Sequence, residues 1–364
     1  MVLRRASLLS LAALACLSCR GRREVADGSG GGLPSATATL ATRVRLSTCG
    51  SKGHTDTIAQ AFSGFMRRGR IYVVNGSVPD IREYDLTGRL VRSFGKRGTG
   101  PGEFARVRWI APLLPDSLMV LDGEMSRVTV FDTAGRYARS FQLTVPQFGQ
   151  AEWIGEYGAG LAFAYSWGFD ARVLRETGPA RDSFFVFLVD RGGHTEAERV
   201  RSLPPIGGRW WRFKEVAYGL GTEAVLDGPL PLIAAGDGVL LAASSDAQSI
   251  ERWNGRAWDI IPLAGQTWSN GLMPGVPDVR IRLYDQLVAG RAGRFWLGDH
   301  RVGSDGRRAW RAFGPDGRTL SVVRLPGAFT LWQVDGNELL GKRTQKTGAE
   351  CLEALDLAEQ DPPR

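Results

Sequence analysis

The segment Arg127-Val-Thr-Val-Phe-Asp-Thr-Ala-Gly-Arg-Tyr-Ala-Arg-Ser-Phe141 decides the fold, because it consists of two β-rich runs around a tight turn. The glycine of the turn supplies the positive φ that such a hairpin needs. Similar turns recur at Asp85–Arg89, Asp190–His194, Asn254–Arg256 and Asp316–Arg318. Their glycines are 47 to 62 residues apart, about one four-stranded propeller blade with its loops, so the repeat predicts stacked blades.

Three β-rich runs accompany the turn in each unit. In the two best preserved units they are residues 71–74, 81–84 and 90–94, and then 117–121, 127–131 and 137–141. Three further sets follow at residues 161–166, 184–189 and 199–203, at 239–243, 250–253 and 258–263, and at 295–297, 309–313 and 320–325. Strands of this length with turns between them are typical of an all-β protein.

The two ends of the chain supply the last blade. Three runs near the C-terminus, residues 331–334, 338–342 and 351–357, lack an outermost strand, and residues 42–48 form a strand without a blade of its own. Ring propellers commonly close when one terminus completes the blade that the other began. We therefore predict an all-β, six-bladed β-propeller of four-stranded antiparallel blades, closed by pairing of the N- and C-terminal strands.

The composition indicates one globular domain. The chain has 364 residues, of which 43% are hydrophobic and 23% charged, with 47 glycines for many tight turns. We predict a signal peptide with a lipobox at residues 1–19, a flexible tether at 20–41, a single β-propeller domain at 42–357 and a C-terminal tail at 358–364. The net charge of +8 comes mostly from arginines spread through strands and turns, which argues against a nucleic-acid partner.

The N-terminus is typical of an export signal. Arg4 and Arg5 precede an apolar stretch that is too short to span a bilayer. Small residues before Cys16 and Cys19 resemble an imperfect bacterial lipobox, and the glycine-rich segment after Cys19 resembles a tether. We predict lipidation at Cys19, with Cys16 as the alternative and an ordinary cleaved signal as the simpler interpretation. Since no Asp follows Cys19, resemblance to enteric lipoproteins places the protein at the outer membrane, facing the periplasm.

Two cysteines, Cys49 and Cys351, remain in the folded part. If the two end strands pair in antiparallel fashion, Cys351 lies opposite Cys49, residue 353 opposite 47, and residue 355 opposite 45. Facing α-carbons about 4.5 to 5.5 Å apart are within the reach of a disulfide, which an exported chain is free to form. We predict a Cys49–Cys351 disulfide, and two free thiols are the alternative.

One part of the chain resembles a known family. The loop Gly98–Phe104, followed by the unit Val120–Phe141, resembles the NHL-repeat family and the related bacterial six-bladed propeller lipoproteins. The resemblance covers roughly residues 69–143, and Arg106 and Val107 stand where the family usually has a proline after the Phe. It implies a central channel used mostly for binding, and in some relatives for metal-dependent lyase or lactonase chemistry.

The sequence contains little reaction machinery. Its only histidines, His54, His194 and His300, have no metal-binding spacing, and no Gly-x-Ser-x-Gly elbow occurs. We therefore predict no catalytic residue, metal ligand or cofactor. Acids that follow an inner or second strand and could surround a channel metal include Asp122, Glu124, Asp246 and Asp299; their alternative role is to be solvated or to support a turn.

The stretch Gly207–Lys214 is the best candidate for ligand contact, because long segments between blades commonly form loops on one face. We predict that Arg209, Trp210, Trp211 and Arg212 stack on and pair with a ligand; packing of the tryptophans in the core is the alternative. The predicted function is a non-catalytic, envelope-anchored binding or scaffold propeller for a protein or glycan. A metal-dependent lyase or lactonase with its site in the channel is the alternative.

Overall fold

The computed structural model describes residues 38–47, 58, 60–113, 116–143, 151–158, 160–166, 179–181, 184–190, 201–202, 210–216, 219–224, 231–264 and 282–359. These residues belong to one compact unit that begins at Thr37. Apart from one short 3-10 helix, η3 (Arg291–Gly293), the regular elements in these ranges are strands. No helix in them is long and apolar enough to cross a membrane.

Six four-stranded antiparallel blades follow one another along the chain, as predicted. The first blade comprises β2 (Ala61–Arg67), β3 (Arg70–Asn75), β4 (Asp80–Asp85) and β5 (Leu90–Phe94). The second blade comprises β8 (Val107–Leu113), β9 (Ser117–Asp122), β10 (Arg127–Asp132) and β11 (Tyr137–Gln142). The third blade comprises β12 (Ala151–Tyr157), β13 (Gly160–Ser166), β15 (Phe184–Asp190) and β16 (Arg201–Ser202). The fourth blade comprises β19 (Pro231–Gly236), β20 (Val239–Ser244), β21 (Ser249–Trp253) and β22 (Trp258–Pro262).

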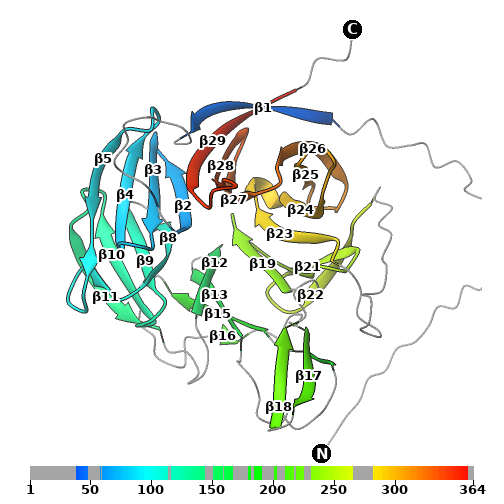
Figure 1. Cartoon of the computed structure of the whole chain (residues 1–364), viewed down its shortest axis with the longest axis horizontal. Coiled ribbons are helices and arrows are strands. Elements are labelled where there is room, and N and C mark those ends of the chain that lie inside the picture. Colours follow the sequence, from blue (N-terminus) through cyan, green and yellow to red (C-terminus); the bar gives the residue numbers. More distant parts are fainter. Residues whose placement is uncertain are drawn as a thin grey trace, which may run out of the picture. The chain divides into compact units, whose positions relative to one another are not determined.

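The last two blades share one eight-stranded sheet. The fifth blade comprises β23 (Tyr284–Ala289), β24 (Phe295–Val302), β25 (Arg307–Phe313) and β26 (Thr319–Pro326). The sixth blade comprises β27 (Phe329–Asp335), β28 (Glu338–Thr344), β29 (Glu350–Glu359) and β1 (Ala38–Ser47). The innermost strands β2, β8, β12, β19, β23 and β27 each contact the next, and β27 contacts β2. The blades therefore form a closed ring (Figure 1).

The hydrophobic core consists of six layers, one in each gap between neighbouring blades. Alternation along a strand produces these layers, because successive side chains point to opposite faces. On β3, Ile71 and Val73 pack toward the last blade, whereas Tyr72 and Val74 pack toward the second blade. The strands are thus buried on both faces, which explains their continuous apolar runs.

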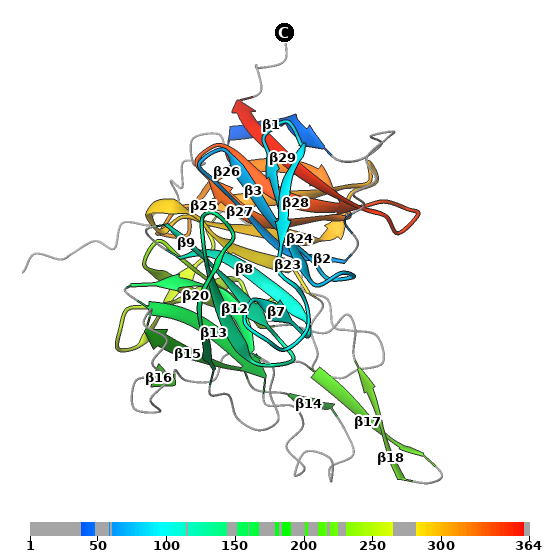
Figure 2. The ribbon, with the colours of Figure 1, turned by 90° about the vertical axis from the view of Figure 1, so that its left-hand side faces the viewer.

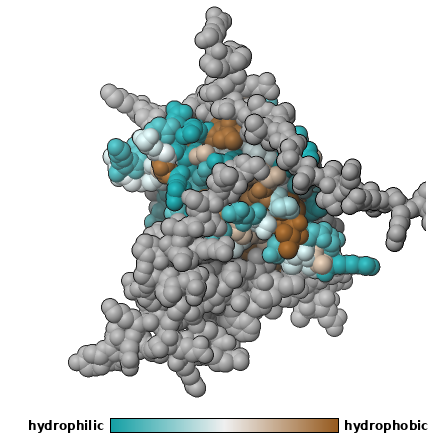
Figure 3. Space-filling view, turned by 90° about the vertical axis from the view of Figure 1, so that its right-hand side faces the viewer, coloured by the Kyte–Doolittle hydropathy of each residue, from teal (hydrophilic) through white to brown (hydrophobic). Residues whose placement is uncertain are grey.

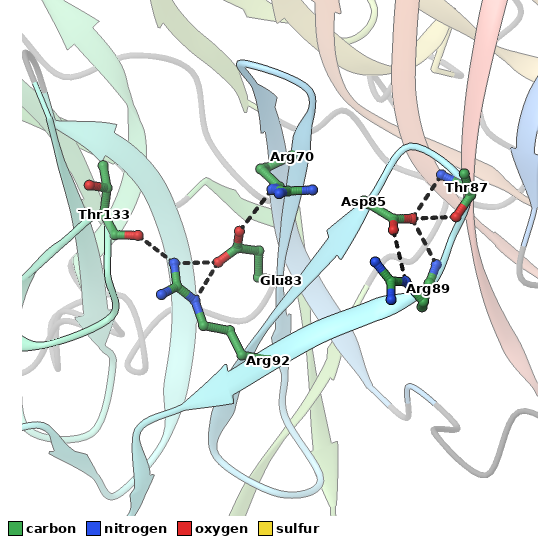
Figure 4. Close-up of polar contacts among 7 residues, drawn as sticks. All are labelled: Arg70, Glu83, Asp85, Thr87, Arg89, Arg92 and Thr133. Atoms are coloured by element: carbon green, nitrogen blue, oxygen red, sulfur yellow. Dashed lines mark hydrogen bonds and ion pairs between the residues drawn. The ribbon is translucent and has the colours of Figure 1, made fainter.

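The outer turn that defines the sequence repeat is held by its aspartate. Asp85 accepts hydrogen bonds from the backbone N–H groups of Thr87 at 2.9 Å and Arg89 at 3.1 Å, and from the Arg89 Nε at 3.2 Å (Figure 4). Hydrogen bonds, first of all that from the Thr87 hydroxyl, hold the pKa of Asp85 below its ordinary value. Gly88 has a φ of 85°, which confirms the reason for glycine at this position.

The N-terminal strand closes the ring, as predicted (Figure 1). β1 runs antiparallel to β29 and places Ser47 opposite Glu353, which confirms that pair. The predicted pair of residues 45 and 355 is wrong: a bulge between Val44 and Leu46 puts Val44 opposite Leu355. β1 begins at Ala38, four residues before the predicted start, and its first residues pair in parallel with β26, which ties the last two blades together.

A separate three-stranded sheet lies outside the six blades. It comprises β14 (Pro179–Arg181), β17 (Trp210–Val216) and β18 (Gly219–Ala224), and Figure 2 shows β17 and β18 projecting from the ring. A short parallel pair, β6 (Lys96–Arg97) and β7 (Glu103–Phe104), folds the glycine-rich crossover between the first two blades. On the face shown in Figure 3, the described residues are partly hydrophilic and partly hydrophobic. Ile260 on β22 is 72% exposed.

Candidate functional site: the central channel

The six innermost strands enclose a cavity of about 750 Å³ on the axis of the ring. Cavities of this size hold small organic ligands in other proteins. Residues of β2, β8, β12, β19, β23 and β27 all line it. The cavity is therefore a product of ring closure, because no single blade could form it.

Carboxylates are the main charged groups of the channel. Glu152 and Glu156 come from β12, Asp237 follows β19, and Asp335 ends β27. Among the described residues of the lining Arg291 is the one basic side chain, and it pairs with Asp335 at 2.7 Å between Nε and Oδ1 and 3.0 Å between Nη2 and Oδ2. The lining thus carries an excess of negative charge in a protein of net charge +8.

Three tryptophans form much of the apolar wall: Trp109, Trp153 and Trp332. The ring of Trp153 meets Phe163 edge-on, with 5.4 Å between centroids. Trp332 packs against Gly64, where an added Cβ would lie 2.8 Å from the indole, so this glycine makes room for the ring. These contacts fix two of the indoles before any ligand arrives.

Neutral polar side chains of the channel join neighbouring blades. The Gln333 amide accepts from Met66 N–H at 2.6 Å and donates to Met66 carbonyl at 3.2 Å. Gln286 accepts from the N–H of Leu331 at 3.1 Å, and the hydroxyl of Ser63 donates to the carbonyl of Ile110 at 3.3 Å. These amides and this hydroxyl hold the ring together, which leaves carboxylates and indole faces as the main groups for a ligand.

A cation stands next to the start of the third blade. The guanidinium of Arg108, on β8, lies 5.1 Å from the centroid of the Phe62 ring. Burial, and then the charge of Arg106, lower the pKa of Arg108, whereas the carboxylate of Glu152 raises it. The charges of Arg108, on the second blade, and Glu152, on the third blade, therefore interact with each other.

An ion-pair network in the fifth blade lies outside the channel lining, and the sequence patterns did not reveal it. Asp285 is 2.8 Å from Nδ1 of His300, 3.1 Å from Nη2 of Arg308 and 3.4 Å from Nη1 of Arg282. These side chains are 12 to 26% exposed. Their signal in the sequence is weak, because only Arg282 is close to Asp285 in the chain, whereas His300 is on β24 and Arg308 is on β25.

The acids considered as metal ligands have other partners. Asp122 is fully buried and accepts from the N–H groups of Ala105 at 2.7 Å, Arg106 at 3.3 Å, Glu124 at 3.0 Å and Met125 at 3.0 Å. Its role is to fasten the crossover onto the second blade, and Glu124 belongs to the same turn.

The remaining two acids are also held by neighbours. Asp246 accepts from the hydroxyl of Ser244, and Asp299 lies 2.7 and 2.6 Å from Nη1 of Arg311. Burial raises the pKa of Asp299 to about 6 even though Arg311 opposes the rise. None of the four acids lines the channel, and no three His, Cys, Asp or Glu side chains of the described ranges are grouped to hold a metal.

The predicted contact residues lie elsewhere in the fold. Trp210, Trp211 and Arg212 belong to β17, so the expected loop is in fact a strand, consistent with its aromatic-rich sequence. Arg209, Cys16, Cys19, Cys49, His54 and His194 lie outside the described residues. Cys351 is on β29 and is disulfide-bonded; its pairing with Cys49 stays a prediction.

Comparison with known proteins adds evidence on the fold. No sequence-family model and no curated protein matches the chain. A solved structure of a DUF4221 family member from Bacteroides vulgatus has a TM-score of 0.51 at 11% identity and covers 89% of this chain and 98% of that one.

Two enzymes are among the more distant structures. Virginiamycin B lyase from Staphylococcus aureus has a TM-score of 0.46 at 11% identity, with 88% and 99% of the two chains covered. A gluconolactonase from Xanthomonas campestris has a TM-score of 0.44 at 14% identity, with 89% and 91% covered. At these identities the likeness concerns the fold alone. The NHL-repeat assignment is not confirmed.

Proposed function

We propose that the protein is an exported, envelope-anchored binding propeller that holds a ligand in its central channel without transforming it. The observation that carries this proposal is the cavity of about 750 Å³, which combines indole walls with carboxylates. The export signal and the cysteine at position 19 support attachment of the folded ring to the outer membrane through a lipid.

Binding fits the site better than the alternative, a metal-dependent lyase or lactonase. Such an enzyme needs several ligands that converge on one ion. The four acids expected for that role are Asp122, Glu124, Asp246 and Asp299; in the described structure three of them accept hydrogen bonds from their own surroundings and none lines the channel. The polar groups that do line the channel suit recognition of a ligand that stays intact.

The experiment that tests binding compares a blocked channel with an open one. Thr330→Trp places an indole in the cavity, since Thr330 lines it, whereas Leu320→Trp adds the same group to an exposed position of β26. Both variants and the wild type are immobilised and incubated with detergent-solubilised envelope extract. We expect a retained component with the wild type and Leu320→Trp that Thr330→Trp fails to retain. Equal retention by all three folded proteins would contradict the channel as the site.

The stretch around β17 is proposed as a second contact surface. Arg209, Trp210, Trp211 and Arg212 keep this role as a proposal, supported by the position of β17 in a sheet outside the blades. A ligand that is a protein or a glycan chain could reach both the channel and this sheet, because such a ligand is longer than the cavity.

A further inference from the structure

The charge of the channel is opposite to the charge of the protein. In the part of the lining that the structure describes, the charged side chains are the carboxylates of Glu152, Glu156, Asp237 and Asp335 and the guanidinium of Arg291. Arg291 is engaged with Asp335 through two contacts of 2.7 and 3.0 Å, so these two charges largely cancel. The chain as a whole carries +8. Among the described lining residues acids therefore outnumber bases, the reverse of the chain as a whole.

Two of these carboxylates are exposed to the solvent of the cavity. The side chains of Glu152 and Asp237 are both exposed, and neither forms an ion pair with another described residue. Asp237 accepts one hydrogen bond, from the N–H of Ala292 at 2.6 Å, and Glu152 interacts electrostatically with Arg108. Both carboxylates keep lone pairs for a ligand.

The aromatic wall strengthens the same preference. Trp109, Trp153 and Trp332 line the cavity together with these acids. The face of an indole attracts a cation, and the attraction grows when the cation leaves bulk water. Trp153 is next to Glu152 in the sequence, and its ring is fixed against Phe163. A bound ammonium group would therefore find carboxylates and aromatic side chains in the same cavity.

We propose that the ligand of the channel carries a cationic amine on an apolar body. This inference rests on the proposed function, because it specifies the ligand class of the same cavity. Three independent observations support it: the size of the cavity, the excess of carboxylates and the indole walls. An anionic ligand would meet repulsion from Glu152 and Asp237, and a neutral one would gain only from the apolar walls.

The test uses three matched probes on the folded ring. They are 4-phenylbutylamine, its N-acetyl derivative and 5-phenylpentanoate, which share the aromatic ring and the chain but differ in charge. Dissociation constants are measured by calorimetry at low and high salt. We expect the amine to bind at least about tenfold more tightly than the carboxylate, and the difference to shrink as salt screens the charges.

Paired variants locate the preference. Glu152→Gln with Asp237→Asn removes two carboxylates of the channel, and Asp116→Asn with Asp316→Asn removes two carboxylates that are 59% and 58% exposed and do not line it. We expect the preference for the amine to fall several-fold in the first double variant and to persist in the second.

The outcomes separate the two proposals. If all three probes bind equally and Thr330→Trp abolishes their binding, the channel is a site and the cationic ligand is overturned. If the amine preference survives in Glu152→Gln with Asp237→Asn, the assignment to these carboxylates is overturned. If no probe binds at millimolar concentration, the inference fails; retention of an envelope component by the open channel alone would still support the proposed function.

Discussion

Ser47 lies opposite Glu353 in the antiparallel ladder that joins the first and last strands of the ring. Glu353 is buried on β29, where the guanidinium of Arg343 approaches it to 2.8 Å. Cys351, two residues before Glu353 on the same strand, is disulfide-bonded. The closing strand β29 therefore carries the ladder to β1, an ion pair with β28 and a disulfide-bonded cysteine.

The first prediction is that the partner of Cys351 is Cys49. Non-reducing digestion and mass spectrometry should give one peptide pair joined through these residues. The link would close a loop of about 300 residues, and in the chain-entropy account its reduction costs about 5 kcal/mol of the free energy of unfolding. A dithiothreitol-treated sample should therefore melt earlier than the oxidised one. Linkage of Cys351 to Cys16 or Cys19, or alkylation of both thiols in the native protein, would show the register argument to be wrong.

The second prediction concerns Glu83, whose side chain is 4% exposed. Its carboxylate lies 3.3 Å from Nε of Arg70 and 2.5 Å from Arg92, which also donates to the carbonyl of Thr133 in the next blade (Figure 4). Glu83→Gln leaves two guanidiniums beside a neutral amide, and we expect it to lower the free energy of unfolding by about 3 kcal/mol.

The control for Glu83 is the exposed pair Arg68–Asp116, which joins the same two blades at 2.6 Å. Because both side chains are mostly in water, Asp116→Asn should change the free energy of unfolding by less than about 1 kcal/mol. Urea denaturation of both variants measures the difference. Equal effects would mean that burial does not decide the strength of these pairs.

The third prediction follows from the pKa of Asp299, which burial raises from 3.8 to about 6 against the effect of Arg311. Between pH 4 and 6 the folded protein keeps a proton that the unfolded chain has released, so stability falls as the pH rises through this window. The loss is at most about 3 kcal/mol and is complete above pH 6. Asp299→Asn cannot ionise and should lack this fall.

Denaturation curves at several pH values between 4 and 7 check the prediction for Asp299. The stability difference between the wild type and Asp299→Asn should change with pH, whereas Asp316→Asn, which replaces a 58% exposed carboxylate, should follow the wild type. A constant difference over the whole range would contradict the raised pKa.

The fourth prediction addresses the pair of tryptophans on β17. This strand belongs to a sheet outside the six blades, so Trp210→Ala with Trp211→Ala should leave the melting temperature of the ring unchanged. If the pair contacts the ligand, retention of the envelope component should weaken in the same variant. Thermal unfolding followed by circular dichroism and the retention assay are run together. A ring that unfolds would instead assign the tryptophans to core packing.

The fifth prediction is lipidation at Cys19. The mature N-terminus from membranes of the producing cell should carry an acyl mass on Cys19, because small residues precede this cysteine and a glycine-rich segment follows it. Cys19→Ser should release the protein into the soluble fraction, and Cys16→Ser should not. An unmodified terminus after cleavage would rule out the anchor.

The architecture was predictable because local sequence determines it. The turn at Asp85–Arg89 needs an acceptor, a positive φ and a donor within five residues, so its recurrence marks the first five blades. Strand alternation fixes which side chains enter which gap, as Ile71 and Tyr72 show. Pairing of the two end strands followed from an unfilled position in the last blade. The bulge at Val44 was not predictable, since an extra residue in one strand leaves no mark in the apolar pattern.

The candidate site was decided by the tertiary structure. The sequence alone determined a ring of blades and its closing strands, because each of these depends on neighbours in the chain; the export signal stays a prediction. Glu152, Asp237 and Trp332 belong to three different blades and share one cavity only because the ring closes. The partners of Asp285 likewise come from several strands of one blade. Long-range packing brings such residues together, and no local spacing encodes it.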